Sequence, residues 1–263
     1  MRHYPRKRFG QNFLIDDHLI ASIIHVINPA SGDRFVEIGP GMGALTQPLL
    51  TLLEHLHVVE IDRDIVQWLR TKYSEQKLTI YAVDALKFDF SQLGPKLRII
   101  GNLPYNISTP LLFHLSQYCS TTIDMHFMLQ QEVVDRMVAE PSTSEYGRLS
   151  VMLQNQFEME KLLSVPATSF HPIPKVESAI VRMIPHANPI VPMADYSVFS
   201  KIVTAAFSQR RKTLRNTLKN HLDMASFAAL QIDPSARAEN LSVFDYATIV
   251  QYLKEYSRPV NII

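Results

Sequence analysis

Short apolar runs alternate with amphipathic stretches through most of the chain. The apolar runs predict strands over Arg34–Ile38, His57–Ile61, Leu78–Val83, Leu97–Ile100 and Met125–Leu129. Helical spacing predicts helices over His18–Ile27, Ala44–Leu53, Asp64–Tyr73, Gln131–Ala139 and Leu149–Gln156, and another that starts near Thr109 with Ser108 as N-cap. This alternation predicts an α/β fold with a parallel, doubly wound sheet that is covered on both faces.

The pattern changes near residue 185. Val176–Ile184 alternates well enough to predict a late antiparallel strand at an edge of the sheet. Three prolines then mark a linker, and only helical patterns follow it, over Tyr196–Phe207, Arg211–His221 and Val243–Tyr256, the last with Ser242 as N-cap and Asp245 at the third helical position. The sequence therefore predicts a large α/β domain over residues 1–185 and a small all-helical domain over residues 186–263.

The composition is ordinary for a globular protein, with 46% hydrophobic and 19% charged residues. A single cysteine, Cys119, excludes an internal disulfide framework and fits a reducing compartment. No signal peptide is apparent, and polar residues interrupt the uncharged stretch from Ile99 to Ile123, which is therefore not a membrane span. We expect a cytoplasmic protein without membrane contact, and a monomer.

The net charge is only +1, but the basic residues are clustered. One cluster lies at the start of the chain, and the other lies in a segment without acids from Tyr196 to Asn220. The residues expected to contact RNA are Arg6, Lys7, Arg8, Arg210, Arg211, Lys212, Arg215 and Lys219. Such runs are often only solvated faces, but two of them in a nearly neutral protein favour a surface that contacts a phosphate backbone.

A glycine-rich turn, Gly39 to Gly43, lies between a predicted strand and a predicted helix. Its spacing also satisfies a loose dinucleotide fingerprint, so a hydride-transferring enzyme is a rival interpretation. Against this rival, Glu37 would repel a pyrophosphate, and Pro40 removes an N–H that a pyrophosphate would need. An acid also follows or ends each of three successive strands, at Glu37, Glu60 and Asp84. That trio fits S-adenosylmethionine, which offers an amine and two ribose hydroxyls and has no phosphate.

Asn102, Leu103, Pro104 and Tyr105 follow the fourth strand, at the same edge of the sheet. The Asn102 carboxamide oxygen and the Leu103 carbonyl can accept the two hydrogens of an exocyclic amine, and Tyr105 can stack on the base. Pro104 rigidifies the loop. The motif resembles that of adenine amino-methyltransferases. It predicts an in-line transfer from a sulfonium to an unpaired base, without a general base.

Motifs along nearly the whole chain resemble the bacterial small-subunit rRNA adenine dimethyltransferase family. They are Phe9–Leu14, the glycine turn, Val59–Asp62, Asn102–Thr109, Phe170–Ser178 and Phe207–Asn216. The last distinguishes the chain from the related erythromycin-resistance methyltransferases. The resemblance implies a Rossmann-like class I methyltransferase domain that uses S-adenosylmethionine, needs no metal, and dimethylates two adjacent adenosines in a hairpin loop near the 3′ end of 16S rRNA in the assembling small ribosomal subunit.

The resemblance also implies roles for individual residues. By matching positions, the residues implied to contact the cofactor are Asn12, Leu14, Gly39, Glu60, Asp84 and Asn102. We expect Glu37, Gly41, Ile61 and Ala85 to contact it as well. Phe170 would face Tyr105 and help to enclose the target adenine, although an aromatic residue before two prolines commonly belongs to the core. Two further functions remain open: an assembly factor that has lost catalysis, and a methyltransferase that acts on large-subunit rRNA.

Overall fold

The computed structural model describes residues 12–256, which form two compact units. The first unit contains the described residues up to Val134 together with Glu158–Pro185. The second contains Asp135–Phe157 and the described residues from His186 onward. The predicted single boundary after residue 185 therefore misses one excursion, in which Asp135–Phe157 leaves the first unit and returns. Long-range bonds explain the excursion, because His186 N–H donates to the Gln156 carbonyl at 2.8 Å.

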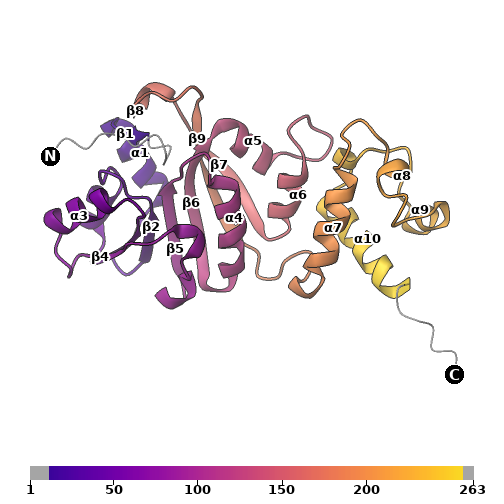
Figure 1. Cartoon of the computed structure of the whole chain (residues 1–263), viewed down its shortest axis with the longest axis horizontal. Helices are drawn as coiled ribbons and strands as arrows, with labels where there is room; N and C mark the ends of the chain where they lie inside the picture. The colour runs from indigo at the N-terminus through magenta and orange to yellow at the C-terminus, as the bar shows by residue number, and fades with distance from the viewer. Residues whose placement is uncertain (1–11, 257–263) are drawn as a thin grey trace. The chain divides into compact units, whose positions relative to one another are not determined.

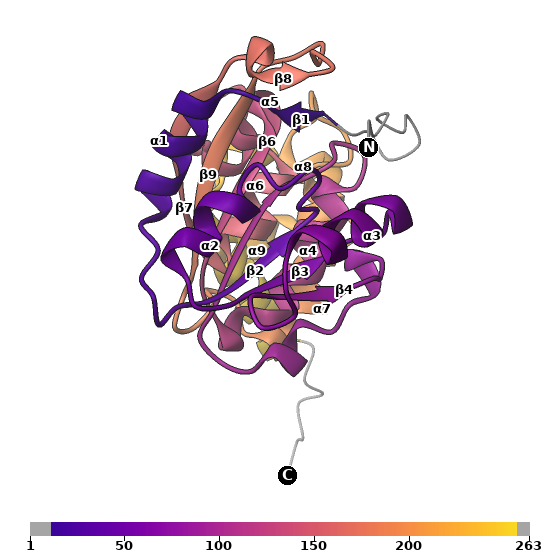
Figure 2. The same cartoon turned by 90° about the vertical axis from the view of Figure 1, so that its left-hand side faces the viewer.

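The described part of the first unit contains a seven-stranded sheet in the order β4-β3-β2-β5-β6-β9-β7 (Figures 1 and 2). The bounds are β2 Arg34–Ile38, β3 Leu56–Val59, β4 Leu78–Tyr81, β5 Leu97–Asn102, β6 Thr122–Gln130, β7 Phe157–Val165 and β9 Ser178–Pro185. Strands β2 to β6 pair in parallel, which confirms the predicted doubly wound sheet. The chain runs outward from β2 to β4 and then restarts at β5 on the other side of β2. Ligands of such sheets bind at the carboxyl ends of the strands where this reversal occurs.

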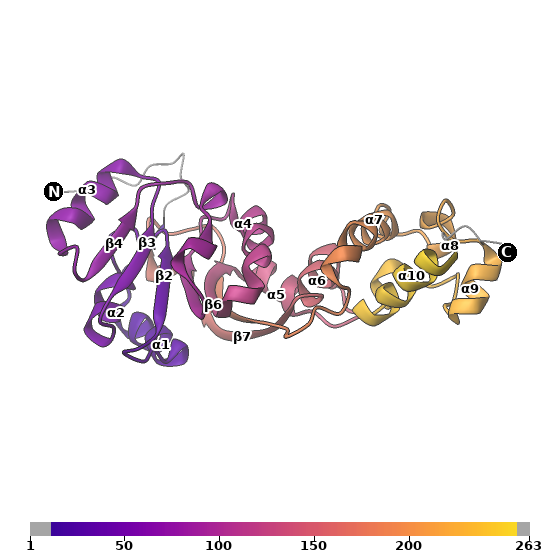
Figure 3. The ribbon, with the colours of Figure 1, turned by 90° about the horizontal axis from the view of Figure 1, so that it is seen from below.

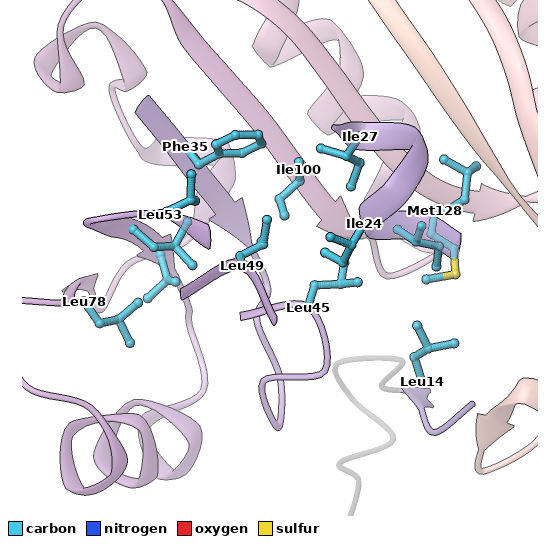
Figure 4. Close-up of a cluster of buried hydrophobic side chains, with 14 of the residues drawn as sticks. Leu14, Ile24, Ile27, Phe35, Leu45, Leu49, Leu53, Leu78, Ile100 and Met128 are labelled. Atoms are coloured by element: carbon cyan, nitrogen blue, oxygen red, sulfur yellow. The ribbon is translucent and has the colours of Figure 1, made fainter. Parts of the chain in front are cut away.

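Helices cover both faces of this sheet. The helices of the first unit are α1 Asp17–Ile27, α2 Thr46–Leu52, α3 Arg63–Lys72, α4 Ser108–Leu115 and the first half of α5 Gln131–Val138. In Figure 3, α1 and α2 lie on the face opposite α4. Figure 4 shows Ile24 and Ile27 of α1 packing toward Leu49 of α2 and Ile100 of β5. Burial of these apolar side chains fixes α1 and α2 against the sheet.

Two late strands differ from the prediction. The strand predicted over Val176–Ile184 exists as β9 and pairs antiparallel to β6, but β7 covers its other side, so it is not at the edge. We did not predict β7, because polar residues such as Glu158, Glu160 and Lys161 break its apolar pattern. A two-stranded ribbon also joins β1 Phe13–Leu14 to β8 Phe170–His171. Strands this short leave no periodic signal in a sequence.

The second unit contains α6 Arg148–Gln154, α7 Tyr196–Ala206, α8 Leu214–Thr217, α9 Met224–Leu230 and α10 Val243–Tyr256. The Ser242 hydroxyl and the Asp245 carboxylate accept from each other's backbone N–H, which confirms the predicted cap of α10. The predicted helix over Arg211–His221 is wrong, since only α8 is α-helical there. The N–H groups of Leu214 and Arg215 instead donate to the carbonyls of Ala236 and Pro234.

The predicted N-cap of α4 is also wrong. Ser108 is the first helical residue, and Ile107 occupies the cap position. The Ser108 hydroxyl donates to the Tyr105 carbonyl at 3.1 Å and so braces the preceding loop. Among residues 12–256, no helix combines the length and the apolar composition that crossing a bilayer requires.

Candidate functional site

The carboxyl ends of β2 and β5 meet at the reversal of strand order, where the glycine turn and Asn102 lie side by side. A Cβ added to Gly39 would lie 3.9 Å from the Asn102 carbonyl oxygen. A pocket of about 540 Å³ opens here, and both the turn and Asn102–Tyr105 line it. This volume lies within the range of small-molecule sites. The structure thus joins the two motifs that the sequence separates by some sixty residues.

Backbone geometry explains the glycines of the turn. Gly39, Gly41 and Gly43 have φ angles of +67°, +54° and +81°, a region that side chains with a Cβ rarely adopt. A Cβ at Gly41 would also lie 3.1 Å from the Phe13 ring. Because Phe13 and Leu14 of β1 line the same pocket, the turn and β1 form two of its walls.

Glu37 is a buried carboxylate that lines the pocket. Burial raises its pKa to about 7; the nearby Glu60 carboxylate adds to the rise, and a hydrogen bond from the Thr46 hydroxyl partly opposes it. That hydroxyl donates to Glu37 Oε2 at 2.6 Å. A buried acid with a raised pKa is poorly solvated, so it favours a cationic ligand.

Glu60 follows β3 and also lines the pocket. It is 6% exposed, and burial raises its pKa. Its carboxylate accepts from the Asp62 backbone N–H at 2.8 Å, which fixes the orientation of the side chain. The backbone N–H groups of Ile61 and Gly41 also lower the pKa of this carboxyl, which partly opposes the effect of burial.

Three predicted cofactor residues lie outside the lining of this pocket. Ile61 is 48% exposed directly after Glu60. Asp84 accepts from the Leu86 N–H at 3.0 Å and caps the short 3₁₀ helix η2, Ala85–Lys87. Ala85 is buried. All three follow β3 or β4 at the edge of the sheet where the pocket opens.

Asn102 is held in a defined orientation. Its carboxamide nitrogen donates to the Asn12 carbonyl at 3.0 Å, so the carboxamide oxygen is the atom that can accept from a ligand. The Leu103 N–H donates to the Met128 carbonyl at 3.2 Å and ties the loop to β6. The half-buried Tyr105 shares a 2.8 Å hydrogen bond with the Ser178 hydroxyl of β9. The oriented Asn102 carboxamide and the Tyr105 side chain therefore lie in the lining of one pocket.

Phe170 does not lie where the sequence analysis placed it. It is 1% exposed, belongs to the hydrophobic core around α1 and α2, and does not line the pocket. It pairs with Leu14 between β8 and β1. The structure thus places the Phe170 ring in the core rather than at the pocket, and its stacking on a base stays a prediction.

Comparisons with known proteins identify the family of the chain. A family model described as ribosomal RNA adenine dimethylase matches residues 2–255. The chain belongs to this family. Similar proteins include ribosomal RNA small subunit methyltransferase A of Nitrosomonas eutropha, 62% identical over 96% of this chain and 98% of the relative. The protein of the same name in Nitrosomonas europaea is 63% identical over 97% and 99%.

Solved structures agree on the fold. A dimethyladenosine transferase from Plasmodium falciparum has a TM-score of 0.73 at 25% identity and covers 92% of this chain and 98% of its own. The 23S rRNA methyltransferase ErmE has a TM-score of 0.72 at 24% identity, with 92% and 100% covered. The chain is thus an rRNA adenine dimethylase with a class I methyltransferase fold, and its methyl donor is S-adenosylmethionine. The buried Glu37 carboxylate and the glycine turn fit a cationic donor without a phosphate.

The predicted RNA contacts of this dimethylase divide into two groups. Arg6, Lys7 and Arg8 lie outside the described residues. Arg210, Arg211, Lys212, Arg215 and Lys219 are all exposed. Arg210 also donates to the Ser144 carbonyl at 2.9 Å and lies 4.0 Å from Glu239, so it has a structural role within the second unit.

The sequence analysis missed several residues of the site. Phe13, Thr46 and Ser178 contact Gly41, Glu37 and Tyr105, respectively. Thr46 and Ser178 are fully buried hydroxyls, and each bonds to a pocket residue. The position of Thr46 at the start of an apolar helix was the only feature of the sequence that pointed to its bond with Glu37. Nothing in the sequence links Ser178 to Tyr105. The described residues contain no group of three or more His, Cys, Asp or Glu side chains placed to hold a metal.

Proposed function

We propose that this dimethylase modifies two adjacent adenosines in the 3′-terminal hairpin loop of 16S rRNA, within the assembling small subunit in the cytoplasm. The observation that carries the proposal is the single pocket lined by Glu37, the glycine turn and Asn102–Tyr105. The name of the 62–63% identical relatives, small subunit methyltransferase A, supports the choice of subunit. We propose that it acts as a monomer.

In this proposal Asn102 and Leu103 activate the target amine. The Asn102 carboxamide oxygen and the Leu103 carbonyl accept its two hydrogens, which turns the nitrogen lone pair away from the ring. The bond from Asn102 to Asn12 keeps that oxygen in place before the base arrives. S-adenosylmethionine, when bound, supplies a methyl group on a positively charged sulfur. Alignment of the amine with the methyl group is sufficient for transfer. No general base is needed, because the methylated amine loses its proton readily afterwards.

Tyr105 supplies the stacking face for the base. Ser178 fixes the ring through the hydroxyl and leaves a face for a planar ligand. Pro104 limits the freedom of the loop that carries Tyr105. Phe170 is the second ring that we propose to enclose the adenine, and it would have to leave its place in the core to do so.

The remaining residues bind the cofactor and the RNA. Glu37 pairs with the cationic end of the cofactor, and Glu60 accepts from its ribose hydroxyls. Asn12, Leu14, Gly39 and Gly41 surround it, and Ile61, Asp84 and Ala85 contact its adenine beyond the pocket. Arg211, Lys212, Arg215 and Lys219 contact phosphates of the rRNA, and Arg6, Lys7, Arg8 and Arg210 contribute to the same charge interaction.

The test is transfer of labelled methyl groups to small subunits from cells that lack the modification, with large subunits assayed in parallel. Nucleoside mapping should find dimethyladenosine at two adjacent positions of the small subunit. Label only in large-subunit RNA would contradict the proposed substrate. Binding of cofactor and subunit without transfer would instead indicate an assembly factor.

A further inference from the structure

The loop between β8 and β9 exposes apolar side chains beside the pocket. Nine large apolar residues are exposed among residues 12–256, and two of them, Ile173 and Val176, belong to this loop. Ile15, directly after β1, is 59% exposed; Ile173 and Val176 in the loop are 65% and 44% exposed. Two exposed apolar side chains in one short loop indicate a contact site, whereas single exposed residues do not.

Both ends of the loop are fixed to walls of the pocket. Before the loop, His171 pairs with Phe13, and Phe13 lines the pocket. After the loop, the Ser178 hydroxyl bonds to Tyr105, which also lines the pocket. Figure 2 shows β8 beside β1. Ile173 and Val176 are therefore held next to the place where the target base enters.

The charges around the loop favour RNA over an apolar protein partner. His171 and Lys175 are exposed. The loop's one acid, Glu177, is exposed, but its carboxylate accepts from the Ala167 N–H at 2.7 Å and is directed back to the protein. Exposed apolar side chains beside a cationic group suit RNA, because the apolar side chains can pack on bases while the cation contacts the phosphate backbone.

We propose that Ile173 and Val176 form a wedge that packs on the bases flanking the target adenine. An adenine that leaves its stack exposes the faces of its neighbours to water, and an apolar side chain placed there restores part of the lost contact. Lys175 contacts the phosphate between these nucleotides. The inference rests on the proposed function, because it takes the adenine that enters beside Tyr105 as the target.

The test compares the full-length chain with its Ile173→Ser variant on an RNA hairpin with two adjacent loop adenines and on unmodified small subunits. We expect the variant to bind the hairpin roughly tenfold more weakly and to raise KM for subunits similarly, because an apolar contact is lost. The slope of affinity against salt should stay unchanged, since no phosphate contact is removed. Cofactor affinity should also stay unchanged. Ile123→Ser is the matched control, because Ile123 is 46% exposed at the amino end of β6, away from the pocket edge.

A second variant tests the contact directly. Trp68 is the only tryptophan of the chain, so the difference in emission between Ile173→Trp and the parent reports on the new ring. Quenching of this signal by the hairpin, with affinity kept or improved, would support packing on bases. The proposed packing on bases would be overturned if Ile173→Ser and the parent bound the hairpin with equal affinity. It would also be overturned if Ile173→Ser lost affinity for whole subunits but not for the hairpin. Methylation by the parent enzyme is measured separately, so a wrong substrate and a wrong wedge give different results.

Discussion

At the residue scale, Asn102 offers the most direct test of the chemistry. Asn102→Ala keeps the end of β5 but removes the carboxamide that Asn12 orients. We expect kcat to fall by about a hundredfold or more, since a preorganised acceptor is lost at the reacting amine. Cofactor affinity should change by only a few fold, as measured by calorimetry. Asn106→Ala, at an exposed position of the same loop, is the control and should retain full turnover. Unchanged turnover in Asn102→Ala would exclude the proposed mechanism.

Glu37 should make the free protein less stable at high pH. Its pKa is raised from 4.5 to about 7, so folding favours the protonated form. The stability it contributes is present below pH 4.5 and is lost as the pH rises through 7. We expect Glu37→Gln to raise the free energy of unfolding by about 3 kcal/mol at pH 8 and to change it little near pH 4.

Urea unfolding of the cofactor-free protein at several pH values measures this difference. The gain of Glu37→Gln over the parent should grow between pH 5 and 7, and a gain independent of pH would argue against the raised pKa. The same variant should bind S-adenosylmethionine more weakly, because it lacks the charge that pairs with the cation. Functional sites commonly contain residues that lower the stability of the free enzyme but strengthen the binding of its ligand.

At the element scale, close packing of β2 against β5 decides where the two motifs meet. Gly101 pairs with Ile38, and a Cβ at Gly101 would lie 2.6 Å from the Ile38 carbonyl oxygen. Gly101→Ala must therefore move one strand end relative to the other. We expect the free energy of unfolding to fall by about 1–3 kcal/mol, with weaker cofactor binding.

Gly32→Ala is the control for this substitution. No atom lies within 4 Å of a Cβ at Gly32, so its stability should change little or rise slightly. Chemical denaturation of both variants measures the difference between them. Equal stability of the two alanine variants would show that the strand ends adjust without cost.

Elements with a strong local signal were predicted well. Arg34–Ile38 and Val243–Tyr256 match β2 and α10 at both ends, because apolar runs and capping residues are local features. Arg211–His221 failed because hydrogen bonds to Pro234 and Ala236 replace helical bonds, and a sequence pattern does not reveal such distant partners. The same limit explains why β7 and the β1–β8 ribbon were missed.

At the scale of the whole molecule, exposed basic residues of the second unit should set the salt dependence of subunit binding. Arg211 and Lys212 are exposed, whereas Arg210 also bonds within its unit. Replacing Arg211 and Lys212 by Gln should weaken binding and reduce the slope of log affinity against log salt by roughly 1 to 2.

The control pair is Lys77 and Lys96, two exposed residues that precede β4 and β5 at the opposite end of the sheet from the pocket. Their replacement by Gln makes the same change in net charge. Filter binding of small subunits over a range of salt concentrations measures both slopes. Equal slopes for the two pairs would mean that net charge, and not a local phosphate contact, controls binding.

The sequence by itself determined the α/β class, the helical end of the chain, and the motifs that line the pocket: the glycine turn, Glu37, Glu60 and Asn102–Tyr105. These features are local, since strand periodicity, turns and caps depend on neighbouring residues. Only the tertiary structure decided that Phe170 is buried, that Thr46 and Ser178 support Glu37 and Tyr105, and that Asp135–Phe157 joins the second unit. Those outcomes depend on contacts between distant segments, which form only when the sheet aligns its strands and the apolar core closes around them.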